Sequence, residues 1–333
     1  MKKILALLLA LWIPAAVLSG CAPQDDSAAS NKLNIVTTIF PAYDWVREIL
    51  GDETDRAEIT TLLDSGVDLH SYQPTVDDIV KISDCDLFLY VGGESDGWVD
   101  DALKNAPNKD RKVIRLLDVL GDSAKAEETV AGMQEEEQDH EEEEHGHEEE
   151  AEYDEHIWLS LKNAQVLVAA ISEALQESDP ARKDTYAANA AAYAEKLSAL
   201  DGEYRAAVDS GKYKTLLFGD RFPFRYLADD YGLDYYAAFP GCSAETEASF
   251  ETVSFLAGKM DALGLPCVLT IEGTQHKIAE TIVQNTAEKN QQILTMDSMQ
   301  AVTANDAASG VSYLSIMEKN LSVLKKALGQ EAE

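Results

Sequence analysis

The sequence predicts an α/β fold with two lobes, each with a mostly parallel sheet flanked by helices, joined by one long bridging α-helix. Two observations support this prediction. Short apolar runs alternate with segments of helical periodicity, which is typical of parallel sheets. An uninterrupted helical pattern also covers residues 178–210, and about 30 helical residues span about 45 Å. A helix of that length is unusual within one compact domain, so we interpret it as a connection between two lobes; a long packed helix is the alternative.

The N-terminal lobe is expected at residues 32–177. Gly51 stops its first helix, and Gly92 and Gly93 close an uninterrupted apolar strand. The predicted strands are 33–38, 59–63, 87–91 and 113–116, and the predicted helices are 43–50 and 76–82.

The bridging helix is expected to begin at Ser178, Asp179 and Pro180, where a capping residue precedes a proline in the first turn. Its Ala-rich pattern continues to about Val208. The C-terminal lobe, residues 211–333, repeats the alternation of strand and helix. Its predicted strands are 215–218, 233–238, 267–271 and 293–294, and its predicted helices are 252–263, 278–286 and 313–328.

The charge of the chain is strongly negative and unevenly distributed. The 333 residues include 61 Asp and Glu against 27 Lys and Arg, a formal charge of −34. Such a polyanion repels phosphate backbones and anionic lipids, so we expect no nucleic-acid binding and no polybasic contact with a membrane. The segment 122–155 alone holds 17 acidic residues and one lysine. The rest of the chain is an ordinary acidic protein.

The acidic segment 122–155 reads as an insert in the N-terminal lobe. Between 134 and 152 it has almost no apolar residues, which is the composition of a solvated, disordered loop. It also contains His140, His145 and His147 among glutamates. Imidazole and carboxylate groups together bind divalent cations, so we predict an accessory metal-binding loop. A simple spacer is the alternative.

The first residues predict export. Lys2 and Lys3 precede the uncharged stretch 4–17, which is too short for a spanning helix. Leu18, Ser19 and Gly20 then lead to Cys21, and this arrangement resembles the lipobox of bacterial lipoproteins. The resemblance implies a signal peptide at 1–20 and an acylated Cys21 that anchors the chain to the lipid bilayer outside the cytoplasm, followed by a tether to residue 31. An ordinary signal peptide with an incidental cysteine is the alternative.

The other cysteines, Cys85, Cys242 and Cys267, show no Cys-x-x-Cys spacing. A disulfide framework is therefore not indicated, although one bridge remains an option in an oxidising compartment. Cys85 and Cys267 lie in apolar, strand-like surroundings and are predicted to be small buried residues. None of the three is singled out as a nucleophile.

Two further histidines, His70 and His156, each lie where an ordered element meets a loop. A structural role is the simple reading of either one alone. However, the segments 68–75 and 154–159 resemble two motifs of the metal-binding lipoproteins that supply zinc or manganese ABC importers. An acidic, His-rich loop just before the second motif is typical of the zinc branch of that family. Residues 36–41 and the long helix fit as well, so the resemblance covers essentially the whole mature chain.

The resemblance implies a metal site with ligands from both lobes. It assigns His70 and His156 to the first lobe. In the second lobe, zinc-binding members usually present a His, and manganese-binding members a Glu, at the end of the strand after the long helix. This chain has Asp220 there, so its match to the family's ligand is approximate. His276 is the favoured fourth ligand, although it also reads as a surface histidine at a helix start. Glu245 and Glu272 are the next candidates.

The predicted function is capture of a divalent transition-metal ion, Zn²⁺ with Mn²⁺ as the alternative, by a monomer that delivers it to an ABC permease. Because one long helix resists bending, only modest lobe shifts are expected on metal release. A surface adhesin or scaffold is a second reading. A metallohydrolase is less favoured: His140 and His145 do not flank a glutamate at one-turn spacing, and no phosphate loop or serine elbow is evident. We therefore expect no enzymatic activity.

Overall fold

Both predicted lobes contain a four-stranded parallel sheet. A computed structural model describes residues 32–104, 107–134, 152–243, 247–273 and 276–330. The strand order is β2-β1-β3-β4 in the first sheet and β6-β5-β7-β8 in the second, and all neighbouring strands run parallel. The predicted fold class is confirmed. The strands are β1 (Leu33–Thr37), β2 (Ala57–Thr61), β3 (Leu87–Tyr90), β4 (Lys112–Arg115), β5 (Thr215–Arg221), β6 (Asp234–Phe239), β7 (Cys267–Thr270) and β8 (Gln292–Thr295).

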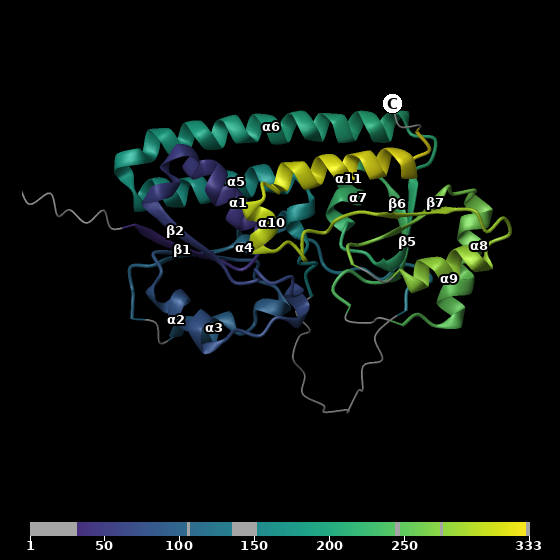
Figure 1. Cartoon of the computed structure of the whole chain (residues 1–333), viewed down its shortest axis with the longest axis horizontal. Coiled ribbons are helices and arrows are strands. Elements are labelled where there is room, and N and C mark those ends of the chain that lie inside the picture. The colour runs from purple at the N-terminus through teal and green to yellow at the C-terminus, as the bar shows by residue number, and fades with distance from the viewer. Residues whose placement is uncertain (1–31, 105–106, 135–151, 244–246, 274–275, 331–333) are drawn as a thin grey trace, which may run out of the picture. The chain divides into compact units, whose positions relative to one another are not determined.

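Helices cover both sheets, and a layer of four of them runs along one side of the molecule (Figure 1). That layer consists of α1, α5, α6 and α11, while α2 and α3 lie on the opposite side of the first sheet. The helices are α1 (Phe40–Leu50), α2 (Val76–Asp84), α3 (Val99–Lys104), α4 (Leu116–Leu120), α5 (Leu161–Ser178), α6 (Lys183–Ser210), α7 (Arg225–Tyr231), α8 (Phe250–Leu263), α9 (Lys277–Asn285), α10 (Ala304–Ala308) and α11 (Tyr313–Ala327).

The long helix is α6, and it starts later than the sequence predicts. Residues Pro180–Arg182 form a separate 3₁₀ turn before α6 begins at Lys183. Asp179 does not cap that turn through its side chain. Its carboxylate instead accepts hydrogen bonds from Arg56 Nε at 3.3 Å and from Tyr186 Oη at 3.1 Å. Asp179, the predicted capping residue, therefore links α6 to the turn that follows α1.

Helix α6 contacts elements of both lobes. It packs against α1 and α5, which belong to the first lobe, and against α7 and α11 of the second. Tyr186, Tyr193 and Tyr204 are buried along its length, and Tyr204 Oη donates to the Met317 carbonyl of α11 at 2.6 Å. These three buried aromatic side chains therefore stabilise the packing of α6 against its neighbouring helices.

A second connection between the lobes comes from residues 124–134, which we call the strap. This segment belongs to the predicted insert, yet it packs on the C-terminal lobe. Lys125 N donates to Tyr226 Oη at 2.9 Å, and Gln134 N donates to the Ala238 carbonyl, also at 2.9 Å. An antiparallel bridge between Ala126 and Tyr153 closes the base of the insert. The insert is thus ordered at both ends, and the predicted accessory ligands His140, His145 and His147 lie outside the described residues.

The main apolar core runs through both lobes. Trp45 and Trp158 belong to the same buried cluster as Phe218 and Tyr313. A second, smaller cluster fills the space between the second sheet and helices α8 and α9, with Leu256 and Ile282 at its centre. Full burial of each such aliphatic side chain contributes about 1.5–3 kcal/mol, and the larger of the two clusters includes side chains of both lobes.

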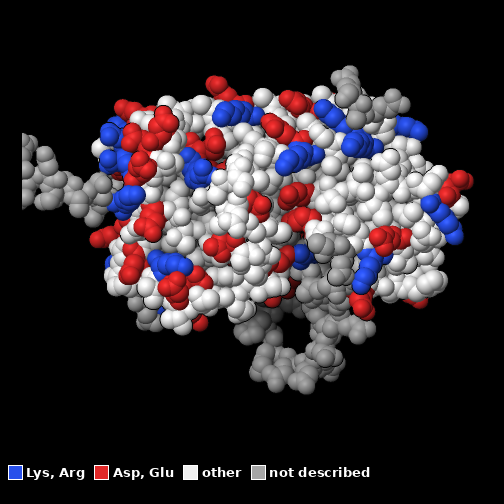
Figure 2. All heavy atoms as spheres, viewed as in Figure 1, with Lys and Arg blue, Asp and Glu red and all other residues white. Residues whose placement is uncertain are grey.

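Acidic and basic side chains are interspersed on the face shown in Figure 2, without a large basic area. This distribution agrees with the expectation that the excess of negative charge is concentrated in the insert. None of the helices in the described ranges combines the length and apolarity needed to cross a bilayer. The predicted signal peptide, Cys21 and the tether lie outside the described residues.

Candidate metal centre

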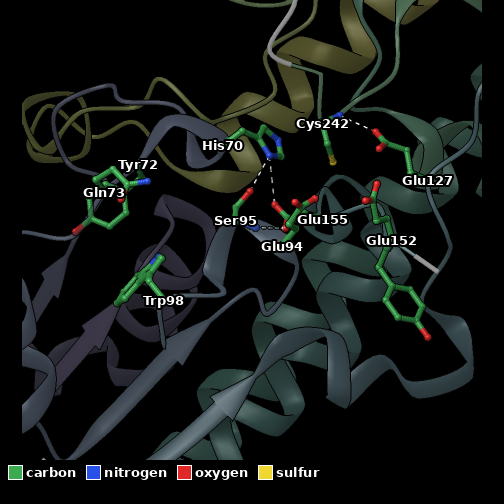
Figure 3. Close-up of a pocket in the computed structure, with 11 residues that line it drawn as sticks. His70, Tyr72, Gln73, Glu94, Ser95, Trp98, Glu127, Glu152, Glu155 and Cys242 are labelled. Carbon is green, nitrogen blue, oxygen red and sulfur yellow. Dashed lines mark hydrogen bonds and ion pairs between the residues drawn. The ribbon is translucent and has the colours of Figure 1, made fainter. Parts of the chain in front are cut away.

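His70 is held in a 3₁₀ turn, Leu69–Ser71, which follows β2. The turn forms because Asp68 Oδ1 accepts a hydrogen bond from His70 N at 3.0 Å, while the buried Leu69 side chain anchors it in the core. On the imidazole ring, Nδ1 lies 2.9 Å from Ser95 Oγ and 3.3 Å from Glu155 Oε2 (Figure 3). These contacts occupy Nδ1 and leave Nε2 directed to the other side of the ring.

His156 is fully buried and precedes a second 3₁₀ turn, Ile157–Leu159. All three side chains of that turn are buried, and Trp158 Nε1 donates to the Ser298 carbonyl at 2.8 Å. Asp154 Oδ1 accepts from His156 N and lies 2.9 Å from His156 Nδ1. Asp154 therefore engages Nδ1 of His156 and leaves its Nε2 free to bind, as Ser95 does for His70. The two Nε2 atoms are 3.3 Å apart.

Cys242 approaches the two histidines from the C-terminal lobe. It lies in the loop after β6, where its backbone N donates to Glu127 Oε1 at 2.8 Å. A sulfur or nitrogen atom from each of Cys242, His70 and His156 lies within 4.8 Å of the other two. Among the described residues, this is the one group of three or more such donors that converges. Sequence reasoning missed Cys242, although one signal could have found it: the carboxyl ends of β5 and β6 meet at one edge of the sheet, and Cys242 follows β6.

The surroundings of His70 favour its neutral form. Burial, the neighbouring His156 ring and Arg221 together lower the pKa of His70 to about 3. The neutral His70 ring therefore forms no ion pair with Glu155, and the hydrogen-bond partner of its Nδ1 is Ser95 Oγ at 2.9 Å. Burial also raises the pKa of the Glu155 carboxyl group. The pKa of the Cys242 thiol is raised as well, first by burial and then by the charges of Asp154 and Glu127.

Arg221 connects the first motif to the C-terminal lobe. It forms an ion pair with Asp68, and its Nη1 donates to the Ser243 carbonyl at 3.3 Å. Burial alone would raise the pKa of Asp68, but the guanidinium group of Arg221 and His70 hold it below its usual range. The loop that carries Cys242 is therefore tied to the turn that carries His70.

The predicted ligands Asp220 and His276 lie outside the converging group. The Asp220 carboxylate accepts from the backbone N of Arg221 at 3.0 Å and of Ile271 at 3.4 Å. His276 precedes α9, and its buried Nδ1 has no hydrogen-bond partner among the described residues. Their role as ligands stays a prediction.

Of the two further candidate ligands, Glu272 and Glu245, the structure describes only Glu272. Glu272 accepts three hydrogen bonds from Ser298 and Gln300, which fixes the loop after β8. Its carboxylate is therefore engaged in building that loop. Glu245 lies outside the described residues.

A cavity of about 370 Å³ leads to His70 and Cys242. Four glutamates line it together with the aromatic side chains of Tyr72 and Trp98, and Figure 3 shows these carboxylates around the sulfur and the imidazole. Carboxylates gathered in a concave site raise the local concentration of cations. The glutamates are Glu94, Glu127, Glu152 and Glu155. Glu152 is the first described residue after the acidic loop, so the loop ends at the mouth of this cavity.

The fold and the converging donors define a two-lobed binding protein with a candidate metal centre between its lobes. The chain belongs to the family described as zinc-uptake complex component A, periplasmic, whose model matches residues 35–327. The sequence-based resemblance to metal-binding proteins of zinc importers is thereby confirmed. Members of this family are metal-binding transport receptors.

Named relatives agree with this membership. The chain is 34% identical over 331 residues to the zinc-binding lipoprotein AdcA of Streptococcus pneumoniae, and the match covers 99% of this chain and 62% of that protein. It is 29% identical over 298 residues to the high-affinity zinc uptake system protein ZnuA of Bacillus subtilis, covering 90% of this chain and 88% of that protein. The chain thus spans less than two thirds of the length of the AdcA relatives.

Solved structures agree with the fold. The Zn(II)-bound ZnuA-like domain of Streptococcus pneumoniae AdcA matches with a TM-score of 0.68 at 30% identity, covering 90% of this chain and all of that domain. The laminin-binding adhesin Lmb of Streptococcus agalactiae matches with a TM-score of 0.72 at 23% identity, covering 89% of this chain and 99% of that one. At that identity the likeness extends to the fold alone.

Proposed function

We propose that this chain captures Zn²⁺ outside the cytoplasm and delivers it to an ABC permease. The single observation behind this proposal is the pairing of His70 Nε2 and His156 Nε2 at 3.3 Å. Two nitrogens that bind one tetrahedral zinc ion at about 2.0–2.1 Å lie about 3.3–3.4 Å apart. The family and the zinc-binding names of the relatives support the same cargo.

The protons of the two rings strengthen the argument. His156 Nδ1 lies 2.9 Å from the Asp154 carboxylate, which accepts hydrogen bonds, and His70 Nδ1 lies 2.9 Å from Ser95 Oγ and 3.3 Å from the Glu155 carboxylate. In the neutral form of each ring, these partners favour a proton on Nδ1 and a lone pair at Nε2. Two lone pairs that face each other repel unless a cation lies between them. Carboxylates behind metal-binding histidines fix the ring and raise its basicity in many zinc sites.

Substitution of the two histidines tests this proposal. We expect His70→Ala and His156→Ala each to lower zinc affinity at least about tenfold in calorimetric titration, since each removes a direct bond to the metal. His140→Ala, in the acidic loop, is the control and should retain the tight zinc site of the unaltered protein. Tight, unchanged binding by both first-lobe variants, with normal folding by circular dichroism, would refute the site.

Manganese is the alternative cargo. The metal content of protein purified without added metal, followed by competition between Zn²⁺ and Mn²⁺, separates the two. We expect zinc to be retained and to displace manganese, because Mn²⁺ is the weakest binder of the divalent first-row series at nitrogen sites. Retention of manganese against an equal concentration of zinc would reverse the assignment. Asp220→Asn and His276→Ala belong in the same experiment as tests of the remaining predicted ligands.

The cellular setting completes the proposal. Acylation of Cys21 would hold a monomeric receptor on the outer side of the cell membrane, next to its permease, and no catalytic step is required of it. Two or more acyl chains bind a bilayer stably, whereas one chain binds only marginally. Mass spectrometry of the mature N-terminus tests this: an unmodified Cys21, or a Cys21→Ala variant that stays with the membrane fraction, would contradict the anchor.

A further inference from the structure

We infer that Cys242 supplies the metal donor of the C-terminal lobe, so that the site consists of two imidazoles and one thiolate and selects a borderline-soft cation over a hard one. This inference rests on the proposed function and specifies its ligand set. It differs from the sequence-based ligands Asp220 and His276, both of which lie outside the converging group.

The geometry brings three separate segments to one point. His70 comes from the turn after β2, His156 from the exit of the insert, and Cys242 from the loop after β6. Their donor atoms lie within 4.8 Å of one another. Nitrogen and sulfur ligands of one tetrahedral zinc ion, at about 2.0–2.1 Å and 2.3 Å from the metal, are about 3.6 Å apart. A small movement of the cysteine side chain therefore suffices to complete the set.

The loop around Cys242 is built against the His156 ring. A Cβ atom at Gly241 would lie 3.2 Å from His156 Nδ1 and 2.9 Å from the Phe222 carbonyl oxygen. Residue 241 therefore has to be small for the loop to approach this closely. Glu127 of the strap holds the next backbone N–H, that of Cys242, at 2.8 Å. Two independent contacts thus hold Cys242 beside the histidine.

Other uses of this cysteine fit the structure less well. Cys85, Cys242 and Cys267 are all free, and the first and last lie buried at the ends of core strands. Cys85 Sγ donates to the Ile82 carbonyl at 3.1 Å, so it already has a structural partner. Cys242 alone among the described cysteines lines the cavity that leads to His70.

The chemistry of the sulfur sets the preference for the metal. On binding, the S–H bond of Cys242 breaks, its proton goes to water, and the electron pair of the sulfur forms the bond to the metal. A thiolate is a soft ligand that suits Zn²⁺, whereas Mn²⁺ prefers oxygen donors. One thiolate with two neutral imidazoles also leaves a net charge of +1 on a bound divalent ion, which the neighbouring carboxylates Asp154 and Glu155 offset.

Cobalt provides the direct test. Co²⁺ takes zinc sites, and a cobalt–thiolate bond gives a sulfur-to-metal charge-transfer band in the near ultraviolet. We expect this band in the unaltered protein and in the Cys85→Ala control, and its loss in Cys242→Ser. The same Cys242→Ser variant should bind zinc at least about tenfold more weakly, a change of about 1.4 kcal/mol, while its manganese affinity changes much less.

The outcomes separate this inference from the proposed function. A cobalt-loaded unaltered protein without the band, or a band that persists in Cys242→Ser, would overturn the thiolate ligand. If His70→Ala and His156→Ala lose zinc in the same series, the proposed function stands while this inference fails. If the unaltered protein binds no zinc, the proposed function itself fails. The presence or absence of the charge-transfer band in the unaltered protein tests the thiolate ligand even if Cys242→Ser does not fold.

Discussion

Asp154 determines the direction of the buried His156 ring. Its Oδ1 contacts both the backbone N and Nδ1 of the histidine at 2.9 Å, and the carboxylate itself is buried. The first motif has a similar arrangement, in which Asp68 fixes the backbone of the His70 turn and Glu155 lies against its Nδ1. The acidic residues of both motifs therefore contact the two histidines and fix their orientation.

This arrangement predicts that Asp154→Asn weakens zinc binding about 10- to 100-fold, because partners behind metal-binding histidines have effects of that size. The amide can present its NH₂ group to Nδ1 and so favour the wrong tautomer. Competition with a chromophoric chelator measures the effect. The exposed Asp52→Asn is a suitable control, and equal affinities of the two variants would contradict the role of Asp154.

A matched pair of glycines tests the close approach at Gly241. Gly241→Ala places a methyl group against His156 and the Phe222 carbonyl, so we expect weaker zinc binding. Gly258 lies within α8, and a Cβ atom added there would have nothing within 4 Å. Gly258→Ala should leave zinc binding unchanged and raise the free energy of unfolding by up to about 1 kcal/mol. Equal zinc affinities of the two variants would show that residue 241 has room for a side chain.

At the scale of elements, the start of α11 depends on a buried carboxylate of α1. Asp44 Oδ2 accepts a hydrogen bond from Tyr313 N at 2.9 Å. Burial is the largest cause that raises the pKa of Asp44 from 3.8 to about 6, and the hydrogen bond from Tyr313 opposes it. Between these two values the folded protein keeps a proton that the unfolded chain has lost. Stability therefore falls as the pH rises through this range, and the whole cost is present above about pH 6.

Asp44→Asn should remove this pH dependence. We expect the variant to exceed the unaltered protein in free energy of unfolding by about 1–3 kcal/mol near pH 8, with the difference shrinking towards about pH 4. Urea titrations at both pH values, with metal chelated, measure it. A variant that is less stable at the higher pH would mean that the charge of Asp44 stabilises the start of α11.

Elements with a clear signal could be predicted from the sequence. All eight strands and the long helix follow from short apolar runs and helical periodicity, most clearly β3 and β7, which are buried at every residue. Helix α5 is absent from the sequence-based prediction, although Leu167, Ile171 and Leu175 have helical spacing and are buried. Helix α5 ends at Ser178, and the capping signal beside it favours the start of the next helix. The sequence pattern therefore does not separate the two helices clearly.

The candidate site could be predicted only in part. His70 and His156 lie in local motifs, and such motifs are visible in a single stretch of sequence. Cys242 has no local signature, since its place beside His156 depends on the strap and on the packing of two strands from distant parts of the chain. Convergence of this kind is a property of the tertiary fold.

At the scale of the whole molecule, the acidic loop begins and ends at ordered contacts. Gln134 donates to the Ala238 carbonyl and accepts from Ser249 N at 2.7 Å, and the Glu152 carbonyl accepts from Glu127 N at 2.8 Å. The composition of residues 135–151 predicts a solvated segment, and ordering such a segment around an ion costs conformational entropy. Its contribution is therefore expected to be weak, transient binding that gathers cations near the cavity.

Deletion of residues 136–150 should remove weak binding equivalents and leave one tight zinc site. Uptake should suffer mainly when zinc is scarce, because loading is then limited by the local concentration. Titrations of the full-length and shortened proteins in one buffer provide the measurement. Loss of the tight site together with the loop would show that the loop supplies primary ligands.

The apolar cluster shared by both lobes has a consequence for how the protein melts. Residues from Ile35 to Leu328 belong to one continuous cluster that includes side chains of both lobes, beside a smaller cluster within the second lobe. Differential scanning calorimetry of the metal-free protein should therefore give a single transition whose calorimetric and van't Hoff enthalpies agree. A core substitution in the second lobe, such as Phe218→Ala, would then lower the midpoint for the whole chain, and the first-lobe histidines would become exposed to solvent at the same temperature as the altered lobe.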